Sequence, residues 1–144
     1  MNLNQFTIKA QEAIQQAFNI ALGYNHQAVE NGHLLKGILS QSESISSFLL
    51  KKLGINQSTF ENVLDKIIES YPKVSGGEQY LSSQANKSLQ KAGHYAKEFN
   101  DEFISVEHLL MGLFAAGDNV SQMMKDNGIT EKDLKNAISL PGRK

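Results

Sequence analysis

Apolar residues recur at every third or fourth position along most of the chain, which is the spacing of helices that bury one face. Two stripes are especially clear: Ala10, Ala13, Ile14, Ala17, Ala21 and Leu22, and then Ala85, Leu89, Ala92, Ala96 and Phe99. Thr7 and Ser82 stand just before the stripes, where a hydroxyl oxygen can cap a helix by accepting from backbone N–H groups. No segment alternates between apolar and polar residues, so the pattern predicts helices and no strands.

The pattern is duplicated. The stretch GHLLKGIL at residues 32–39 returns as EHLLMGLF at residues 107–114, and the same offset of 75 positions aligns residues 6–39 with residues 81–114. Two copies of roughly 65 residues are too long and too few for a solenoid, whose units usually span about 20–50 residues. We therefore predict a duplicated half-domain that folds into one body with a pseudo-twofold axis.

Each copy is predicted to contain four helices, so the expected fold is all-α, with two tandem four-helix repeats. The third helices, near 44–53 and 119–127, end at glycines that suit the C′ position. The fourth helices are expected to bury Phe60, Val63, Leu64, Ile67 and Ile68 in one copy and Leu134, Ala137 and Ile138 in the other. The predicted boundaries are repeat one at 1–70, a proline- and glycine-containing linker at 71–79, and repeat two at 80–140.

One glycine occurs inside the second helix of each copy, Gly37 and Gly112. A glycine in a helix interior costs about 1 kcal/mol relative to alanine, so two equivalent glycines suggest a steric reason. We predict that another backbone crosses close to each of them, where a Cβ atom would intrude. The alternative is that both survive by chance from the ancestral repeat, and in either case their role is structural.

The composition and charge of the chain argue against several classes of function. The 144 residues carry a formal net charge of −1 with acids and bases interspersed, which argues against a nucleic-acid partner or a binding site for an anionic membrane. No apolar run approaches the roughly 20 residues of a membrane span and the N-terminus lacks a signal-peptide core, so we expect a cytoplasmic protein. The absence of cysteine excludes disulfides, thiolate metal sites and cysteine catalysis.

The sequence lacks the common catalytic and metal-binding motifs. The chain contains no G-x-x-x-x-G-K-[ST] phosphate loop, no H-E-x-x-H zinc motif and no G-x-S-x-G nucleophile elbow. The four histidines lack the spacing of metal ligands and have no nearby helical partner in the pattern. We therefore expect no metal site, no cofactor and no enzymatic activity in this chain.

Three segments together carry a family resemblance. The opening NLNQFTIKAQEAI, the two H-L-L-x-G helices and the G-I-(N/T) start of each last helix resemble the double N-terminal domain of the Clp-family AAA+ unfoldases. The linker YPKVSGGEQYLS resembles that of the ClpB disaggregases within this family, and the resemblance covers about residues 1–140. It implies a fragment whose residues 141–144 begin a flexible tether to two ATPase rings.

In that family the rings form a homohexamer, bind ATP and Mg²⁺, and act with a DnaK-type chaperone system. The resemblance therefore implies that ATP and Mg²⁺ belong to the missing ATPase domains. It also implies that this domain recognises unfolded or aggregated protein clients, and we expect the isolated domain to be a monomer.

The same resemblance points to client-binding residues, each of which has a structural alternative. Thr7 in F-T-x-K, Asp101 in D-x-F-I-S and Glu107 in S-x-E-H match the family's motifs, and an apolar groove maps to Leu89 and to the position of His108. Thr7 could simply cap a helix, Asp101 could hold a turn, and Glu107 could stabilise a helix N-terminus. Leu89 could be a core residue of its stripe.

The sequence leaves three alternatives to client recognition. A related Clp domain binds adaptors or phosphoarginine through one glutamate per repeat, but here Gly32 stands opposite Glu107. The chain could instead be a free-standing adaptor of a Clp protease, which reading the gene beyond Lys144 would decide. An all-α nucleic-acid binder is disfavoured by the balanced charge.

Overall fold

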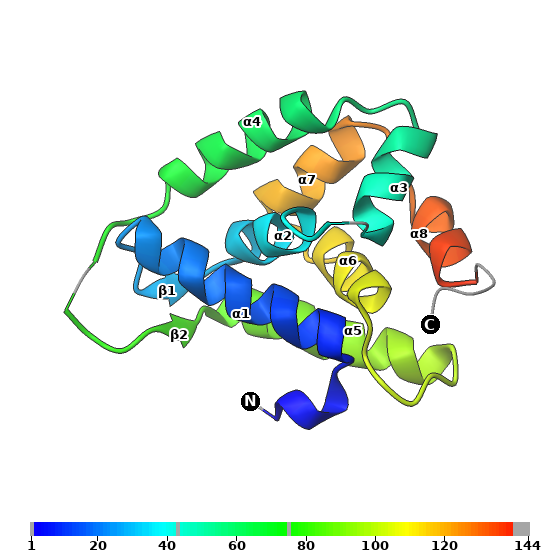
Figure 1. The fold of residues 1–144 in the computed structure, drawn as a ribbon, viewed down its shortest axis with the longest axis horizontal. Helices are drawn as coiled ribbons and strands as arrows, with labels where there is room; N and C mark the ends of the chain where they lie inside the picture. Colours follow the sequence, from blue (N-terminus) through cyan, green and yellow to red (C-terminus); the bar gives the residue numbers. More distant parts are fainter. Residues whose placement is uncertain (1, 43, 75, 140–144) are drawn as a thin grey trace.

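The computed structural model describes residues 2–42, 44–74 and 76–139, so the predicted tether at 141–144 lies outside the described residues. Eight α-helices lie within this part of the chain, and they confirm the predicted all-α class (Figure 1). In chain order, the secondary-structure elements are the 3₁₀ helix η1 (Leu3–Gln5), α1 (Ile8–Gly23), β1 (Ala28–Val29), α2 (Asn31–Leu39), α3 (Ile45–Lys52), α4 (Gln57–Glu69), β2 (Tyr80–Leu81), α5 (Ser83–Glu98), α6 (Val106–Phe114), α7 (Asn119–Asp126) and α8 (Glu131–Ile138).

The predicted helix ends are confirmed by local hydrogen bonds and backbone angles. The Thr7 hydroxyl accepts from the Ala10 amide at 3.2 Å, and the Ser82 hydroxyl accepts from the Ala85 amide at 3.0 Å. After α3 and α7 the chain turns through glycines with positive φ angles, 73° at Gly54 and 91° at Gly128. These values lie in the left-handed region, which glycine enters without a Cβ penalty.

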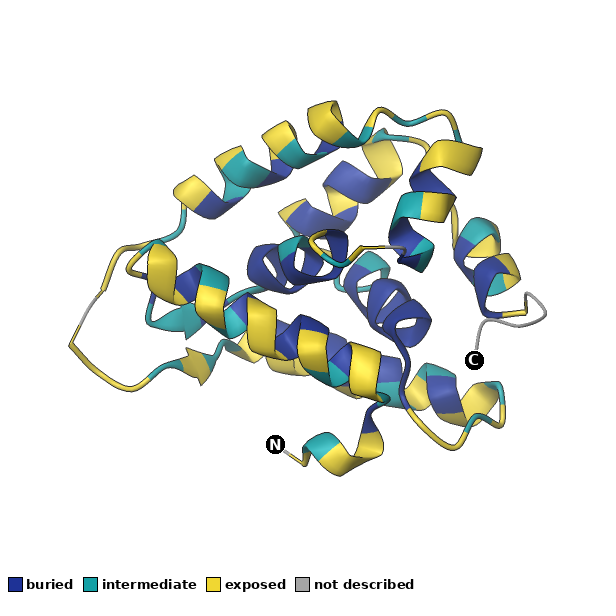
Figure 2. Cartoon of the chain, in the orientation of Figure 1, coloured by how far each residue is buried: buried dark blue, intermediate teal, exposed yellow. Residues whose placement is uncertain are grey.

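The core is built around α2 and α6. Every residue of α2 except Lys36 is buried, and so is every residue of α6 except Phe114 (Figure 2). The amphipathic helices α1 and α5 pack against them with small residues, mostly alanines, along the inner face. Small side chains let two helix backbones approach closely, which explains why these stripes are rich in alanine.

The prediction of a close backbone crossing at both glycines is confirmed. A Cβ atom on Gly37 would lie 2.5 Å from the Ala13 carbonyl oxygen of α1. A Cβ atom on Gly112 would collide in the same way with the Ser88 carbonyl oxygen of α5. The two glycines therefore set the distance between α2 and α1 and between α6 and α5.

The prediction that the fold contains no strands is wrong. Strands β1 and β2 pair in parallel, with the Ser82 amide donating to the Val29 carbonyl at 3.0 Å. Thr7 and Ile104, which the offset of 75 aligns with Ser82 and Val29, form the equivalent bond: the Thr7 amide donates to the Ile104 carbonyl at 2.9 Å. Repeat two donates in the first bond and repeat one in the second, so the contact is reciprocal between the repeats. Reciprocal contacts of this kind are those that a twofold axis generates. Each strand is only two residues long, which is too short to leave an alternating pattern in the sequence.

Two predicted core residues are exposed. Leu22 in the last turn of α1 is 64% exposed and Val63 on α4 is 42% exposed. Ala21, one residue before Leu22, is 0% exposed, so the last turn of α1 still packs in the core. Consecutive side chains of a helix point about 100° apart, and Leu22 therefore lies outside the buried face.

None of the helices in residues 2–42, 44–74 and 76–139 has both the length and the apolar character that crossing a membrane requires.

Candidate functional site

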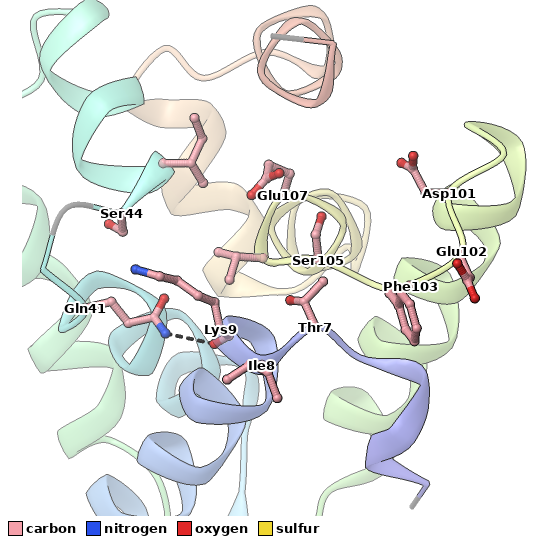
Figure 3. A pocket seen from close by; sticks show the side chains of 12 residues that line it. Thr7, Ile8, Lys9, Gln41, Ser44, Asp101, Glu102, Phe103, Ser105 and Glu107 are labelled. Carbon is pink, nitrogen blue, oxygen red and sulfur yellow. Dashed lines mark hydrogen bonds between the residues drawn. The ribbon is translucent and has the colours of Figure 1, made fainter. Parts of the chain in front are cut away.

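A pocket of about 510 Å³ lies where the two repeats meet (Figure 3). Its walls come from the start of α1, the segment that leads into α3, and the turn that joins α5 to α6. The bond from the Thr7 amide to the Ile104 carbonyl holds the first and last of these walls together. On the remaining side, the Gln41 side-chain amide donates to the Lys9 carbonyl at 2.8 Å.

The pocket brings together three of the five client-binding residues predicted from the sequence. Thr7, Asp101 and Glu107 all line it, although nearly a hundred positions separate the first from the other two. Thr7 lies at the N-cap of α1, Asp101 in the turn after α5, and Glu107 in the first turn of α6. Their proximity follows from the reciprocal pairing of the repeats.

The walls of the pocket include solvent-exposed apolar side chains. Ile8 is 70% exposed and Phe103 is 45% exposed, and both face the pocket alongside Ile45 and Val106. Large apolar side chains that gather at a hollow and remain open to water are a common feature of binding sites for other molecules. An apolar group that entered this pocket would remove their surface from water.

The rim of the pocket is acidic. Asp101, Glu102 and Glu107 supply three carboxylates, whereas Lys9 supplies one ammonium group. Glu107 is only 7% exposed. It lies in the first turn of α6, where the positive end of the helix macrodipole favours a negative charge. A ligand with a positive charge beside an apolar group would suit this distribution.

His108 lies beneath the pocket and not in its wall. It is 0% exposed, so the expectation that this position belongs to the groove surface is corrected. Its Nδ1 atom accepts from the Ser105 amide at 2.8 Å, which leaves the ring proton on Nε2. Nε2 in turn lies 2.9 Å from an Asp101 carboxylate oxygen. His108 therefore orients Asp101, which is the residue that reaches the pocket.

Leu89 lies in the core, away from the pocket between the repeats. It is 7% exposed, packs in the core, and borders a second hollow of about 560 Å³ next to Phe6 and Ile104. Leu89 does not line the pocket between the repeats. A contact between Leu89 and a client would therefore have to occur on the other side of the turn that carries Asp101.

Thr7 both caps α1 and lines the pocket, and two substitutions separate these roles. We expect Thr7→Ala to lower the free energy of unfolding by about 1 kcal/mol because the cap is lost. Thr7→Ser retains the hydroxyl and should remain within a few tenths of a kcal/mol of the wild type. Urea unfolding followed by circular dichroism measures both, and equal stability of the two variants would show that the cap contributes nothing.

Repeat one contains a histidine pair that the sequence pattern did not reveal. Nδ1 of His26 lies 2.9 Å from Nε2 of His33, and Nδ1 of His33 accepts from the Glu30 amide at 2.8 Å. Burial lowers the pKa of His33 to about 4, with a further contribution from the neighbouring His26. The prediction concerned metal-ligand spacing and helical partners, and this pair is neither, because His26 lies outside the helices. The offset of 75 places His26 opposite Asp101 and His33 opposite His108, so the pair stands where repeat two has the contact of His108 with Asp101.

Among the residues that the structure describes, no group of three or more histidine or carboxylate side chains is placed to hold a metal ion.

Comparison with known protein families decides the affiliation of the chain. The model of the Clp repeat (R) N-terminal domain matches residues 5–127. The chain is a Clp N-terminal domain. The resemblance found in the sequence motifs is thereby confirmed.

This Clp N-terminal domain is similar to the first part of known chaperones. It is 50% identical over 139 residues to the chaperone protein ClpB of Bacteroides thetaiotaomicron, with 96% of this chain covered. It is 42% identical over 138 residues to the chaperone protein ClpB of Porphyromonas gingivalis, again with 96% of this chain covered. The domain spans about one sixth of the length of these relatives, since the matches cover 16% of each.

The fold also matches a solved structure. The crystal structure of the Hsp104 N-terminal domain from Candida albicans superimposes with a TM-score of 0.82 at 22% identity. The superposition covers 97% of this chain and 93% of that one. At this identity the match establishes the shared fold of the Clp N-terminal domain.

Proposed function

We propose that this domain recognises unfolded or aggregated polypeptide clients in the pocket between the repeats and helps deliver them to an ATP-dependent disaggregase. The observation that carries the proposal is the exposed apolar wall formed by Ile8 and Phe103 beside an acidic rim. The similarity to proteins named chaperone protein ClpB supports it, because the clients of a chaperone are polypeptides.

In this proposal the catalytic machinery lies outside the domain. ATP and Mg²⁺ would bind to ATPase domains of the whole protein, which would assemble as a homohexamer and work with a DnaK-type chaperone system. The domain itself would take no chemical step. Its contribution would be to hold a client near the entrance of the ring.

The size of the pocket predicts weak binding. Burying one client leucine or phenylalanine contributes about 1.5–3 kcal/mol, whereas a millimolar dissociation constant already requires about −4 kcal/mol. Affinities in the micromolar to millimolar range follow. Six domains tethered to one ring would compensate through their high effective concentration, and a weak grip would allow the motor to withdraw the client.

We expect an unfolded polypeptide to shift the NMR signals of residues around the pocket at submillimolar to millimolar concentration. A reduced and alkylated protein that remains unfolded is a suitable probe. The Ile8→Ser variant should bind this probe several-fold more weakly because the most exposed of the pocket's large apolar side chains is removed.

The Leu22→Ser variant is the matched control, since Leu22 is similarly exposed on the same helix but does not line the pocket. Equal weakening by both variants, or no chemical-shift change at millimolar probe, would contradict the proposal. Nanomolar binding to one folded protein would also contradict it.

The structure gives little support to a phosphoarginine site with one acid per repeat. In repeat one, Gly32 takes the place of Glu107, and a Cβ atom there would lie 2.7 Å from the Tyr71 hydroxyl. The position therefore lacks both the acid and the space for one. We expect free phosphoarginine to cause no chemical-shift change near Gly32.

A further inference from the structure

The linker between the repeats is attached next to the histidine pair of repeat one. Figure 1 shows it as a loop at the edge of the molecule that leaves the end of α4 and returns at β2. Its residues 72–74 are exposed to solvent. The backbone of Val74 forms a parallel bridge with His26, and the Tyr80 amide donates to the Gln27 carbonyl at 3.1 Å. These contacts hold the linker against the segment that leads into β1 and α2.

Tyr71 anchors the start of the linker. Its hydroxyl accepts from the Gly32 amide at 3.1 Å. Its ring centroid lies 5.2 Å from that of His33 and 5.9 Å from that of His26. Both imidazole rings are buried. The place of Tyr71, and with it the path of the linker, therefore depends on contact with the two imidazole rings.

The hydrogen bonds of the pair determine where its protons lie. Nδ1 of His33 accepts from the Glu30 amide at 2.8 Å, so the ring proton of this histidine is on Nε2. That proton is donated to Nδ1 of His26, which lies 2.9 Å away. The ring proton of His26 is therefore on Nε2. Each ring carries one proton in this arrangement, and both rings are neutral.

The pair cannot accept a further proton without losing a hydrogen bond. A proton added to Nδ1 of His26 would point at the N–H group of His33. A proton added to Nδ1 of His33 would point at the amide of Glu30. Among the residues that the structure describes, none accepts from the buried Nε2 atom of His26, so no bond there offsets an added charge. Protonation therefore disrupts the contact on which Tyr71 rests.

The charges around the pair direct this disruption toward the linker. The titratable groups that surround the pair and its tyrosine are Tyr24, Glu30, Tyr71, Lys73 and Asp118. Burial is the main cause of the lowered pKa of His26, Lys73 lowers this pKa further, and Glu30 raises it. Lys73 belongs to the linker, so a charge on His26 would repel the linker itself.

The linker is also the part of this contact that can move at the lowest cost. Since residues 72–74 are already exposed, their detachment would bring little buried surface into water. His33, in contrast, lies in α2, in which every residue except Lys36 is buried. Segments with an exposed backbone and few buried contacts open locally at a lower free energy than the whole domain requires to unfold.

We propose that the linker is an acid-released strap. When the histidine pair takes up a proton, Tyr71 and the linker residues after it detach from the start of α2, while the helices of both repeats stay folded. Release uncovers the Gly32 amide and the two imidazole rings. None of these groups lines the pocket between the repeats, so the inference does not depend on the proposed function.

Hydrogen exchange followed by NMR tests the proposal in the wild-type domain. The Gly32 and Tyr80 amides report on the strap, and the amides of α6 report on global unfolding. Protection factors are compared, because they are corrected for the intrinsic effect of pH on exchange. The open state binds more protons than the closed state, so acidification favours it. If opening returns the pKa of His33 from about 4 to the ordinary 6.5, protection of the strap amides falls about 30-fold between pH 7.5 and pH 5.0.

Low concentrations of urea distinguish local release from global unfolding. Release of the strap exposes little surface, so the protection of the Gly32 and Tyr80 amides should not change with urea. The protection of the α6 amides should fall with urea in the same samples. The His26→Gln/His33→Gln double variant should give strap protection that is independent of pH between 7.5 and 5.0. His94→Gln changes an exposed histidine on α5 and should behave as the wild type.

Nitrogen chemical shifts of the imidazole rings provide a measurement that needs no variant. We expect both rings to carry their proton on Nε2 at pH 7.5, and strap protection to fall as the pair takes up a proton. Protonation of the pair without loss of strap protection would overturn the proposal. Strap amides with the same protection and urea dependence as α6 would overturn it too, and so would a double variant that keeps the pH dependence of the wild type.

Discussion

Gly112→Ala is expected to lower the free energy of unfolding by about 2–3 kcal/mol, as overpacking of a well-filled core does. The new methyl group would collide with the Ser88 carbonyl oxygen, which belongs to the backbone of α5 and cannot rotate away. Relief would require α5 and α6 to separate, and this would loosen contacts along the whole length of their interface. Urea unfolding monitored by circular dichroism measures the loss.

Gly93→Ala provides a matched control in the same pair of helices. A Cβ atom on Gly93 would meet only the Ile104 side chain at 3.5 Å, which is an ordinary contact distance. Because alanine is favoured over glycine in a helix interior, this variant should be up to about 1 kcal/mol more stable than the wild type. Opposite signs for the two variants are the expected result. A Gly112→Ala protein as stable as Gly93→Ala would show that the crossing of α5 and α6 can widen without loss.

The duplication made much of the fold predictable. A helical stripe in one copy predicts a stripe in the other, and the glycines shared by the two copies indicated where backbones cross. Leu22 shows the limit of this approach, because an apolar residue beside a stripe can lie outside the buried face, as Leu22 does next to the buried Ala21. The strands were missed because two paired residues leave no periodic signal.

The pocket was harder to predict than the fold. Motifs indicated Thr7, Asp101 and Glu107 separately, but only the pairing of Thr7 with Ile104 shows that they share one cavity. Ile8 and Phe103 were missed because exposed apolar residues in a sequence resemble any others. His108 could not be assigned to the interior from its motif alone, since burial of a histidine depends on a partner such as Asp101.

The domain is expected to lose stability on acidification between pH 6.5 and pH 4, through the histidine pair of repeat one. The unfolded chain binds a proton at His33 near the ordinary pKa of 6.5, whereas burial keeps the folded pKa at about 4. The unfolded state therefore holds more protons in this window, and the free energy of unfolding falls as the pH is lowered. The lowered pKa of His26 acts in the same direction. We expect the contribution of His33 to be about 2–3 kcal/mol.

His33→Gln isolates this contribution, because a glutamine at the third helical position can still accept from the Glu30 amide as in a capping box. The variant should be less stable than the wild type at pH 8, where it loses the bond to His26, and this deficit should shrink or reverse at pH 4.5. His94→Gln changes an exposed histidine on α5 and controls for the loss of an imidazole. Parallel stability curves for the wild type and His33→Gln between pH 8 and pH 4.5 would show that the folded domain accepts a proton at His33 without cost. That result would mean that the folded domain tolerates a charged His33. The packing of the Tyr71 ring against His33 would then not require a neutral imidazole.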